Sequence, residues 1–218
     1  KVITTHKSIW RHSYSINSLI ARLKSKEQFT TPLEVPFITH WLHNMNHDQV
    51  LDMLKYLNMS NAPESKVKVI FVPCYLDGND GIWNMHYYDL ILGYDLSVYP
   101  SYYEPWGYTP LESIAFHVPT VTTDLAGFGL WVNSLKGRFS ELADGVKVIH
   151  RTDYNYSEVA DVIKDTVSDF SALSAAEIKK IRKNAAAIAE KALWKHFIQY
   201  YYEAYDIALR NAEKRLAL

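Results

Sequence analysis

Between residues 67 and 149 the sequence alternates short apolar, β-branched runs with segments of helical character, and this alternation restricts the fold more than any other feature. Strands that alternate with helices pair in parallel and connect through right-handed crossovers. We therefore expect an α/β fold with a doubly wound parallel sheet, whose first strand is buried on both faces. The predicted strands are residues 67–73, 96–100, 119–122 and 145–149, and the predicted helices are residues 87–93, residues 110–116 and a turn near Leu130.

The segments on either side of this alternation are predicted to be mainly helical. Before it, we expect a helix over residues 8–26, an extended piece over residues 35–39, and a helix that Asp48 caps and that runs to Leu57. After residue 156 the helical pattern continues, over residues 174–192 and 193–218. The expected parts are an N-terminal helical and extended segment (1–36), a sheet domain (37–155) and a C-terminal helical extension (156–218).

Charge and composition exclude several classes of partner. The formal net charge is −1, and a protein that binds nucleic acid or an acidic membrane usually presents a clustered basic face. No run approaches the roughly 20 apolar residues of a membrane helix. The single cysteine, Cys74, cannot form an internal disulfide, and no signal-like start is visible, so we expect a cytoplasmic protein. The 16 Tyr and 6 Trp suit sugars, nucleobases or interfaces, and composition does not choose among them.

The segment that follows the predicted strand at residues 96–100 is where a ligand is expected, because ligands of open α/β sheets lie outside the carboxyl ends of the strands. Gly107 allows the backbone to approach a ligand closely, Thr109 is the expected helix cap, and Pro110 fits the first helical turn. Free amides at such a helix start can bind a phosphate or a pyrophosphate.

Two carboxylates bracket this helix start. Glu104 lies in the loop before the helix, and Glu112 lies eight positions later in its first turns, so both are expected to face one ligand. The string PSYYEPWGYTPLE at residues 100–112 resembles the signature of glycogen synthases of the UDP-glucose-using animal and fungal type and their bacterial relatives. Further pieces agree in order: Thr39-His40, Asp48, KVKVIFVP at 66–73, TTDLAGFG at 122–129, and Trp194, Tyr200-Tyr201 and Ala208-Leu209.

The resemblance implies a hexosyltransferase with two Rossmann-like domains, of which this chain is the incomplete C-terminal half that binds the donor. It implies transfer of glucose from a nucleotide-sugar, UDP-glucose, to the non-reducing end of an α-1,4-glucan, with retention of configuration and without a metal or other cofactor. The N-terminal acceptor domain would be the missing partner, and we expect no activity from the fragment alone. ADP-glucose as the donor and the oligomeric state stay open.

The resemblance also implies a role for each site residue. Glu104 would hold hydroxyls of the donor glucose at the reacting centre, as an electrostatic partner of the sugar or as a nucleophile, and we favour the first. The donor-binding residues would be Gly107, Tyr108 and Thr109 for the phosphates, Glu112 for the ribose, Tyr87 for stacking on uracil and Trp106 for shaping the sugar pocket. Other interpretations are a sucrose or trehalose-phosphate synthase type of transferase and a non-catalytic sugar-binding module.

Several other features have simpler interpretations. The spacing of His40, His43 and His47 would suit zinc on a helix, but Pro36 makes a helix doubtful there, and we expect no metal. Gly127-Phe128-Gly129 is too short for a phosphate loop and is expected to bound the donor pocket or to turn the chain. Trp106, Tyr108 and Tyr87 can also be packing residues, and Cys74 a small buried one. The basic residues Lys179, Lys180, Arg182 and Lys183 are expected to form a solvated helix face.

Overall fold

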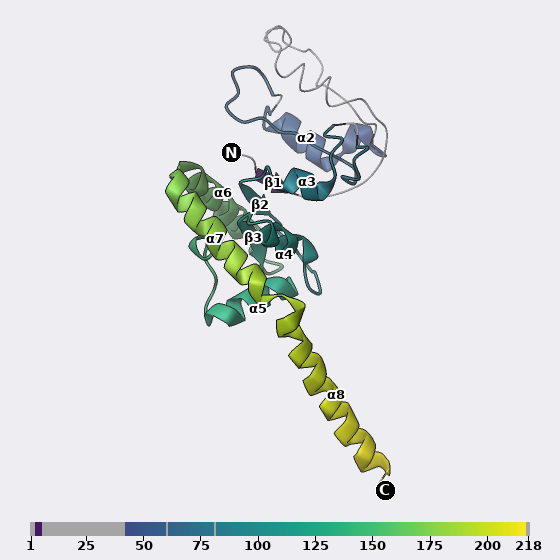
Figure 1. The fold of residues 1–218 in the computed structure, drawn as a ribbon. Coiled ribbons are helices and arrows are strands. Elements are labelled where there is room, and N and C mark those ends of the chain that lie inside the picture. The colour runs from purple at the N-terminus through teal and green to yellow at the C-terminus, as the bar shows by residue number, and fades with distance from the viewer. Residues whose placement is uncertain (1–2, 6–41, 60, 81, 217–218) are drawn as a thin grey trace. The chain divides into compact units, whose positions relative to one another are not determined.

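The computed structural model describes residues 3–5, 42–59, 61–80 and 82–216 (Figure 1). The chain divides into two compact units, one of Lys1–Thr5 with Ile91–Leu218 and one of His6–Leu90. The helix predicted at residues 8–26 and the extended piece at 35–39 lie outside the described residues. The three-part division expected at residues 36 and 155 stays a prediction.

Within the described residues, a parallel sheet of four strands forms the centre of the first unit, in the order β1-β2-β3-β4. Its register pairs Val98 with Val121 and Thr123 with Ile149. The three strands predicted at 96–100, 119–122 and 145–149 are confirmed. The strands are β1 (Ile3–Thr5), β2 (Leu96–Val98), β3 (Thr120–Thr123) and β4 (Val146–Ile149).

The strand predicted at residues 67–73 is wrong. No strand forms across residues 66–74, all of which are described, and Val67 and Ile70 are 61% and 46% exposed. The Asn61 side chain takes both backbone groups of Val69, because its Oδ1 accepts from the Val69 N–H and its Nδ2 donates to the Val69 carbonyl, each at 2.7 Å. An apolar run makes a strand only where a neighbouring strand supplies these bonds, and here a side chain supplies them instead.

The helices predicted within the described residues are present with shifted ends. In α2, Asp48 caps the first turn as expected, because its Oδ1 accepts from the Val50 and Leu51 N–H groups at 3.0 Å. No helix of the described residues is long and apolar enough to cross a membrane. The helices of the described part of the chain are η2 (Met45–His47), α2 (Gln49–Tyr56), α3 (Tyr87–Ile91), α4 (Tyr108–Ala115), α5 (Gly127–Lys136), η3 (Leu142–Asp144), α6 (Tyr156–Ala172), α7 (Ala175–Lys191) and α8 (Trp194–Leu216).

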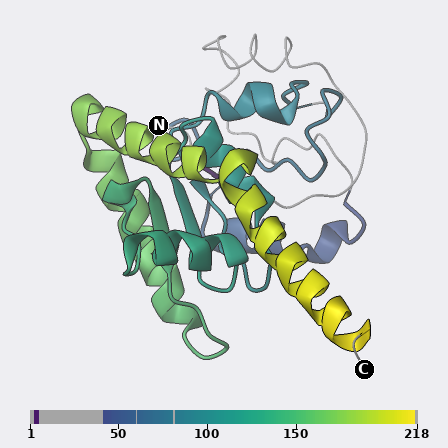
Figure 2. The same cartoon turned by 60° about the horizontal axis from the view of Figure 1, so that its bottom comes forward.

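Two hydrophobic clusters cover the two faces of the sheet, because successive strand residues point to opposite faces. Val146 and Val148 of β4 pack with residues of α4, α5 and α7, whereas Ile149 packs with residues of α6. Helices α6 and α7 diverge from the turn at residues 173–174 (Figure 2). The buried residues Val159 and Phe170 of α6 belong to the cluster of Ile149, whereas Ala185 and Ile188 of α7 belong to the cluster of Val146 and Val148. The chain is thus an α/β protein with a parallel sheet and long C-terminal helices, consistent with a Rossmann-like fold.

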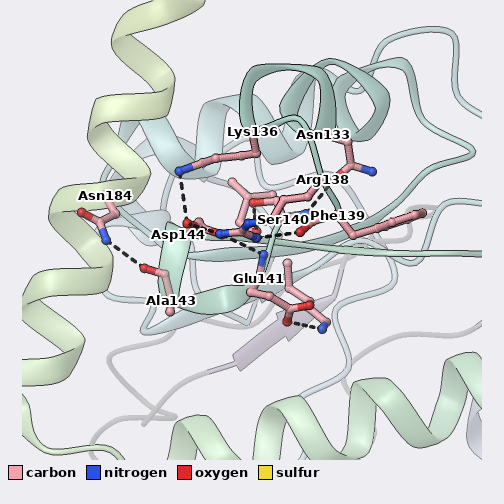
Figure 3. A network of polar contacts seen from close by, with 11 residues as sticks. Asn133, Lys136, Arg138, Phe139, Ser140, Glu141, Ala143, Asp144 and Asn184 are labelled. Carbon is pink, nitrogen blue, oxygen red and sulfur yellow. Dashed lines mark hydrogen bonds and ion pairs between the residues drawn. The ribbon is translucent and has the colours of Figure 1, made fainter.

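A polar network fixes the amino end of β4 (Figure 3). Asp144, the last residue of η3, pairs with Lys136 at 3.2 Å and with Arg138 at 2.8 Å, and its carboxylate also accepts from the Glu141 N–H at 3.1 Å. Asn184 of α7 donates to the Ala143 carbonyl at 2.8 Å. The network joins the end of α5, η3 and α7 at the amino ends of the strands. A ligand is expected at the opposite, carboxyl ends.

Candidate functional site

The loop that follows β2 is held against the segment between β3 and α5. Thr123 Oγ1 donates to the Ser101 carbonyl at 2.6 Å, and the Glu104 N–H donates to the Leu125 carbonyl at 3.2 Å. The Gly127 N–H in turn donates to the Glu104 carbonyl at 3.1 Å. The loop therefore has a fixed backbone at the carboxyl edge of the sheet.

Glu104 is half-buried in this loop. Ser101 Oγ donates to its Oε2 at 3.1 Å, which fixes how the carboxylate is turned. The same Oε2 lies 3.5 Å from the position that a Cβ on Gly107 would take. Glu104 is thus next to the start of α4, as the sequence predicted.

The start of α4 depends on a glycine, and here one expectation is wrong. The cap of α4 is Gly107 and not Thr109, which is the second helical residue. Gly107 has φ +106°, a left-handed conformation that other residues adopt only with strain. A Cβ there would also lie 3.2 Å from Pro110 Cγ. Pro110 lies in the first turn, as expected.

The two helix starts beside the loop differ in what their amides bind. In α5, the Gly127 and Phe128 N–H groups donate to the carbonyls of Glu104 and Trp106. No side chain caps α4, and Pro110 in its first turn has no N–H. The amides of α4 are therefore the ones suited to an anion, while residues 127–129 begin α5 and hold the loop.

The remaining predicted site residues of this unit lie on α4 and in its approach. Tyr108 is 71% exposed, and Thr109 and Glu112 are half-buried. Trp106 packs into an aromatic cluster, with ring centroids 6.1 Å from Phe128, 5.7 Å from Trp131 and 5.7 Å from Phe197. These contacts match the packing interpretation of Trp106, and its role in a sugar pocket stays a prediction.

Tyr87 belongs to the other unit, where it begins α3. Its N–H donates to the Leu76 carbonyl at 3.0 Å, and its ring centroid lies 5.4 Å from that of Tyr88. The stacking of Tyr87 on a base stays a prediction. In the same unit, partial burial and then the charges of Asp80 and Asp77 raise the pKa of the Cys74 thiol, which disfavours a reactive thiolate.

Sequence reasoning missed a group of side chains at the carboxyl ends of β3 and β4. Asp124 follows β3, and its Oδ2 lies 2.6 Å from His150 Nδ1 while its Oδ1 accepts from the Arg151 N–H at 2.9 Å. Arg151 Nη1 donates to the Pro100 carbonyl at 2.6 Å. A hydrogen bond to Asp153 is the main reason that the pKa of the Tyr102 phenol is raised. Ligands of open α/β sheets lie outside the carboxyl ends of the strands, and this holds for the residues after β3 and β4 as well as for those after β2.

The basic residues of α7 do not all face solvent. Lys179, Lys180 and Lys183 are exposed, as predicted, but Arg182 Nη2 donates to the Tyr94 carbonyl at 2.6 Å and pairs with Asp95 at 3.3 Å. The solvated interpretation is therefore wrong for Arg182, which ties α7 to the chain before β2. Among the residues that the structure describes, no group of His, Cys, Asp and Glu side chains is arranged to hold a metal; His40 lies outside them.

The fold and the site define an α/β protein with a carboxylate and a glycine-capped helix start at the carboxyl edge of a parallel sheet. A family model described as glycogen synthase matches residues 19–215. The chain therefore belongs to the glycogen synthase family.

Individual relatives agree with this assignment. A glycogen [starch] synthase of Neurospora crassa is 29% identical over 88% of the chain and 26% of its own length. Glycogen [starch] synthase isoform 2 of Saccharomyces cerevisiae is 30% identical over 81% and 25%, and a glycogen [starch] synthase of Caenorhabditis elegans 31% over 78% and 25%. The chain thus spans about a quarter of the length of the curated relatives it matches.

Proposed function

We propose that the complete protein is a glycosyltransferase of glycogen synthesis, which transfers glucose from a nucleotide-sugar to the non-reducing end of an α-1,4-glucan, and that this region binds the donor. The observation that carries the proposal is the place of Glu104 in a chain of this family. Its carboxylate is fixed by Ser101 at the carboxyl end of β2, next to the glycine-capped start of α4. Ligands of parallel α/β sheets bind at this edge.

The diphosphate of the donor, UDP-glucose in this proposal, lies over Gly107, Tyr108 and Thr109. Two observations support this position. Gly107 has no side chain, so the diphosphate can approach the backbone closely, and no side chain caps the first amides of α4. As the bond from the sugar to the diphosphate breaks, amides that are already fixed stabilise the leaving group without reorganisation. Glu112 holds the ribose, Tyr87 stacks on uracil, and Trp106 borders the sugar.

Glu104 acts on the sugar as an electrostatic partner of an oxocarbenium-like centre, and the reaction retains the anomeric configuration. The hydrogen bond from Ser101 and the bonded backbone of Glu104 support a preorganised carboxylate. Following the resemblance of residues 100–112, the proposal includes no metal or other cofactor.

The proposed setting is a cytoplasmic protein whose donor domain is a doubly wound, Rossmann-like sheet. Hydrophobic clusters on both faces of the sheet support this arrangement. The acceptor glucan is bound together with an N-terminal domain of the same protein. Neither nucleic acid nor a membrane is part of the proposal, which the net charge of −1 supports.

Turnover of UDP-glucose by the complete protein tests the proposal, with glycogen as the acceptor. We expect elongation of the glucan, and we expect Glu104→Gln to lower kcat at least about 100-fold because the charge at the reacting centre is lost. Glu158→Gln is the matched control, since Glu158 lies in the first turn of α6 after β4, and it should leave kcat unchanged. Full activity of Glu104→Gln would refute the role of Glu104.

Product analysis and nucleotide titration separate the other interpretations. Formation of sucrose or trehalose phosphate with small acceptors would indicate a different retaining transferase. Comparison of UDP-glucose with ADP-glucose determines the donor. Saturable UDP binding that is lost in Thr109→Ala supports the donor site, whereas binding of glucan without any nucleotide binding would indicate a non-catalytic module.

A further inference from the structure

Arg151 connects the end of β4 to the loop that carries Glu104, although 51 positions separate it from its partner in the sequence. Its Nη1 donates to the carbonyl of Pro100, the residue at which that loop begins, at 2.6 Å. Its guanidinium also lies over the ring of Tyr102, 5.4 Å from the ring centroid. Arg151 thus contacts the loop through both the backbone and a side chain.

The backbone of Arg151 is in turn held by Asp124. The half-buried carboxylate of Asp124 accepts from the Arg151 N–H at 2.9 Å and lies 2.6 Å from His150 Nδ1. The Asp124 N–H donates to the Ile149 carbonyl at 3.0 Å, so Asp124 is anchored to β4. Tyr102 also contacts Asp153 through its hydroxyl. The ends of β3 and β4 therefore form a rigid support for residues 100–102.

We propose that Arg151, held by Asp124, is a positioning residue for Glu104: it fixes the start of the loop, and Ser101 passes that position on to the carboxylate. This inference rests on the proposed function. The chain of contacts runs from Arg151 to the Pro100 carbonyl, through Ser101, whose Oγ donates to Glu104 Oε2 at 3.1 Å. A displacement of about 1 Å at a reacting group can cost about 100-fold in rate.

Steady-state kinetics of the complete protein with UDP-glucose and glycogen measures this positioning. We expect Arg151→Ala to lower kcat about 10- to 100-fold and to change the donor KM less than about threefold, because the phosphates meet α4 and not residues 100–102. Arg151→Lys should be intermediate, since an ammonium can donate to the Pro100 carbonyl but lacks the planar guanidinium that lies over Tyr102. Arg138→Ala is the matched control, because Arg138 also donates to a backbone carbonyl and pairs with an aspartate, at the other end of β4.

Amide hydrogen exchange of the same variants gives a readout that does not depend on turnover. In Arg151→Ala the amides of residues 101–104 should exchange faster than in the wild type, and those of α6 and α7 should not change; Arg138→Ala should leave residues 101–104 unaffected. Unchanged exchange at residues 101–104 would refute the support, and wild-type kcat in Arg151→Ala beside an inactive Glu104→Gln would refute the positioning role. If Glu104→Gln keeps full turnover, the proposed function fails at this residue, and exchange alone then decides whether Arg151 holds the loop.

Discussion

Thr120 and Thr122 are both fully buried in β3, but their hydroxyls differ in what they contact. Thr120 Oγ1 donates to the Val118 carbonyl at 3.1 Å, whereas Thr122 Oγ1 has no hydrogen-bond partner in the described part of the chain. Burial of an unpaired hydroxyl costs about 1–3 kcal/mol. The two positions form a matched pair on one strand.

We expect Thr122→Val to raise the free energy of unfolding by about 1 kcal/mol, because the methyl group needs no partner. Thr120→Val should lower it by about 1 kcal/mol, because a hydrogen bond is lost. Chemical denaturation of both variants measures the difference. Changes of the same sign in the two variants would contradict the assignment of the unpaired hydroxyl.

At the scale of elements, the contact between α5 and the loop that carries Glu104 depends on Gly127. A Cβ at Gly127 would lie 2.2 Å from the Pro105 carbonyl oxygen, so a larger residue must push the loop away from α5. Gly127→Ala should therefore destabilise the fold by about 1–3 kcal/mol and lower transferase activity, as thermal unfolding and turnover of the complete protein would measure. Gly137→Ala is the control: a Cβ there meets nothing within 4 Å, so only its backbone strain remains and activity should be unaffected.

The network between η3 and α5 predicts a dependence of stability on pH. Partial burial acts to raise the pKa of Asp144, but hydrogen bonds from Glu141, Lys136 and Arg138 outweigh it and hold the pKa below its ordinary value. The folded state therefore favours the carboxylate, and this stability is present above the ordinary pKa of about 3.9 and is lost as the pH falls through the folded value.

Unfolding of the wild type and of Asp144→Asn between pH 7 and pH 2 tests this dependence. The difference in the free energy of unfolding should be largest near neutral pH and should shrink below about pH 4. A gap that stays constant down to pH 2 would rule out the link to Asp144.

At the scale of the whole molecule, the chain corresponds to about a quarter of each curated relative. We expect the 218 residues alone to form no glucan from UDP-glucose and glycogen, because the proposed acceptor domain is not among them. Radiolabelled glucose incorporation measures this, with the complete protein as the positive control. Robust synthesis by the 218 residues would show that the donor region is sufficient.

Much of the first unit could be predicted from the sequence, because the order of elements there follows from local patterns. The runs at β2, β3 and β4 and the glycine and proline around α4 each mark their own element. The segment at residues 67–73 could not be predicted in the same way, since Asn61 and not a neighbouring strand meets Val69. Local rules also favoured Thr109 as the cap, whereas the left-handed residue Gly107 is the cap, so α4 starts two residues earlier than predicted.

The support behind the candidate site was beyond sequence reasoning for a different reason. Arg151 meets Pro100, and Arg182 meets Tyr94, across 51 and 88 positions of chain. Such contacts form only after the sheet has brought distant loops together. The local sequence around a single arginine does not indicate which residue it will contact. Residues directly after predicted strands are the practical place to look for them.

The packing of Phe197 on Trp106 and Trp131 gives the protein an optical consequence. Phe197 lies in the first turn of α8, and its ring centroid is 5.5 Å from that of Trp131. Indole emission depends on the polarity around the ring, so any displacement of the base of α8 that wets these two indoles will shift their fluorescence to longer wavelength. The tryptophan fluorescence of the unlabelled protein therefore reports movement between α8 and the loop that carries Glu104.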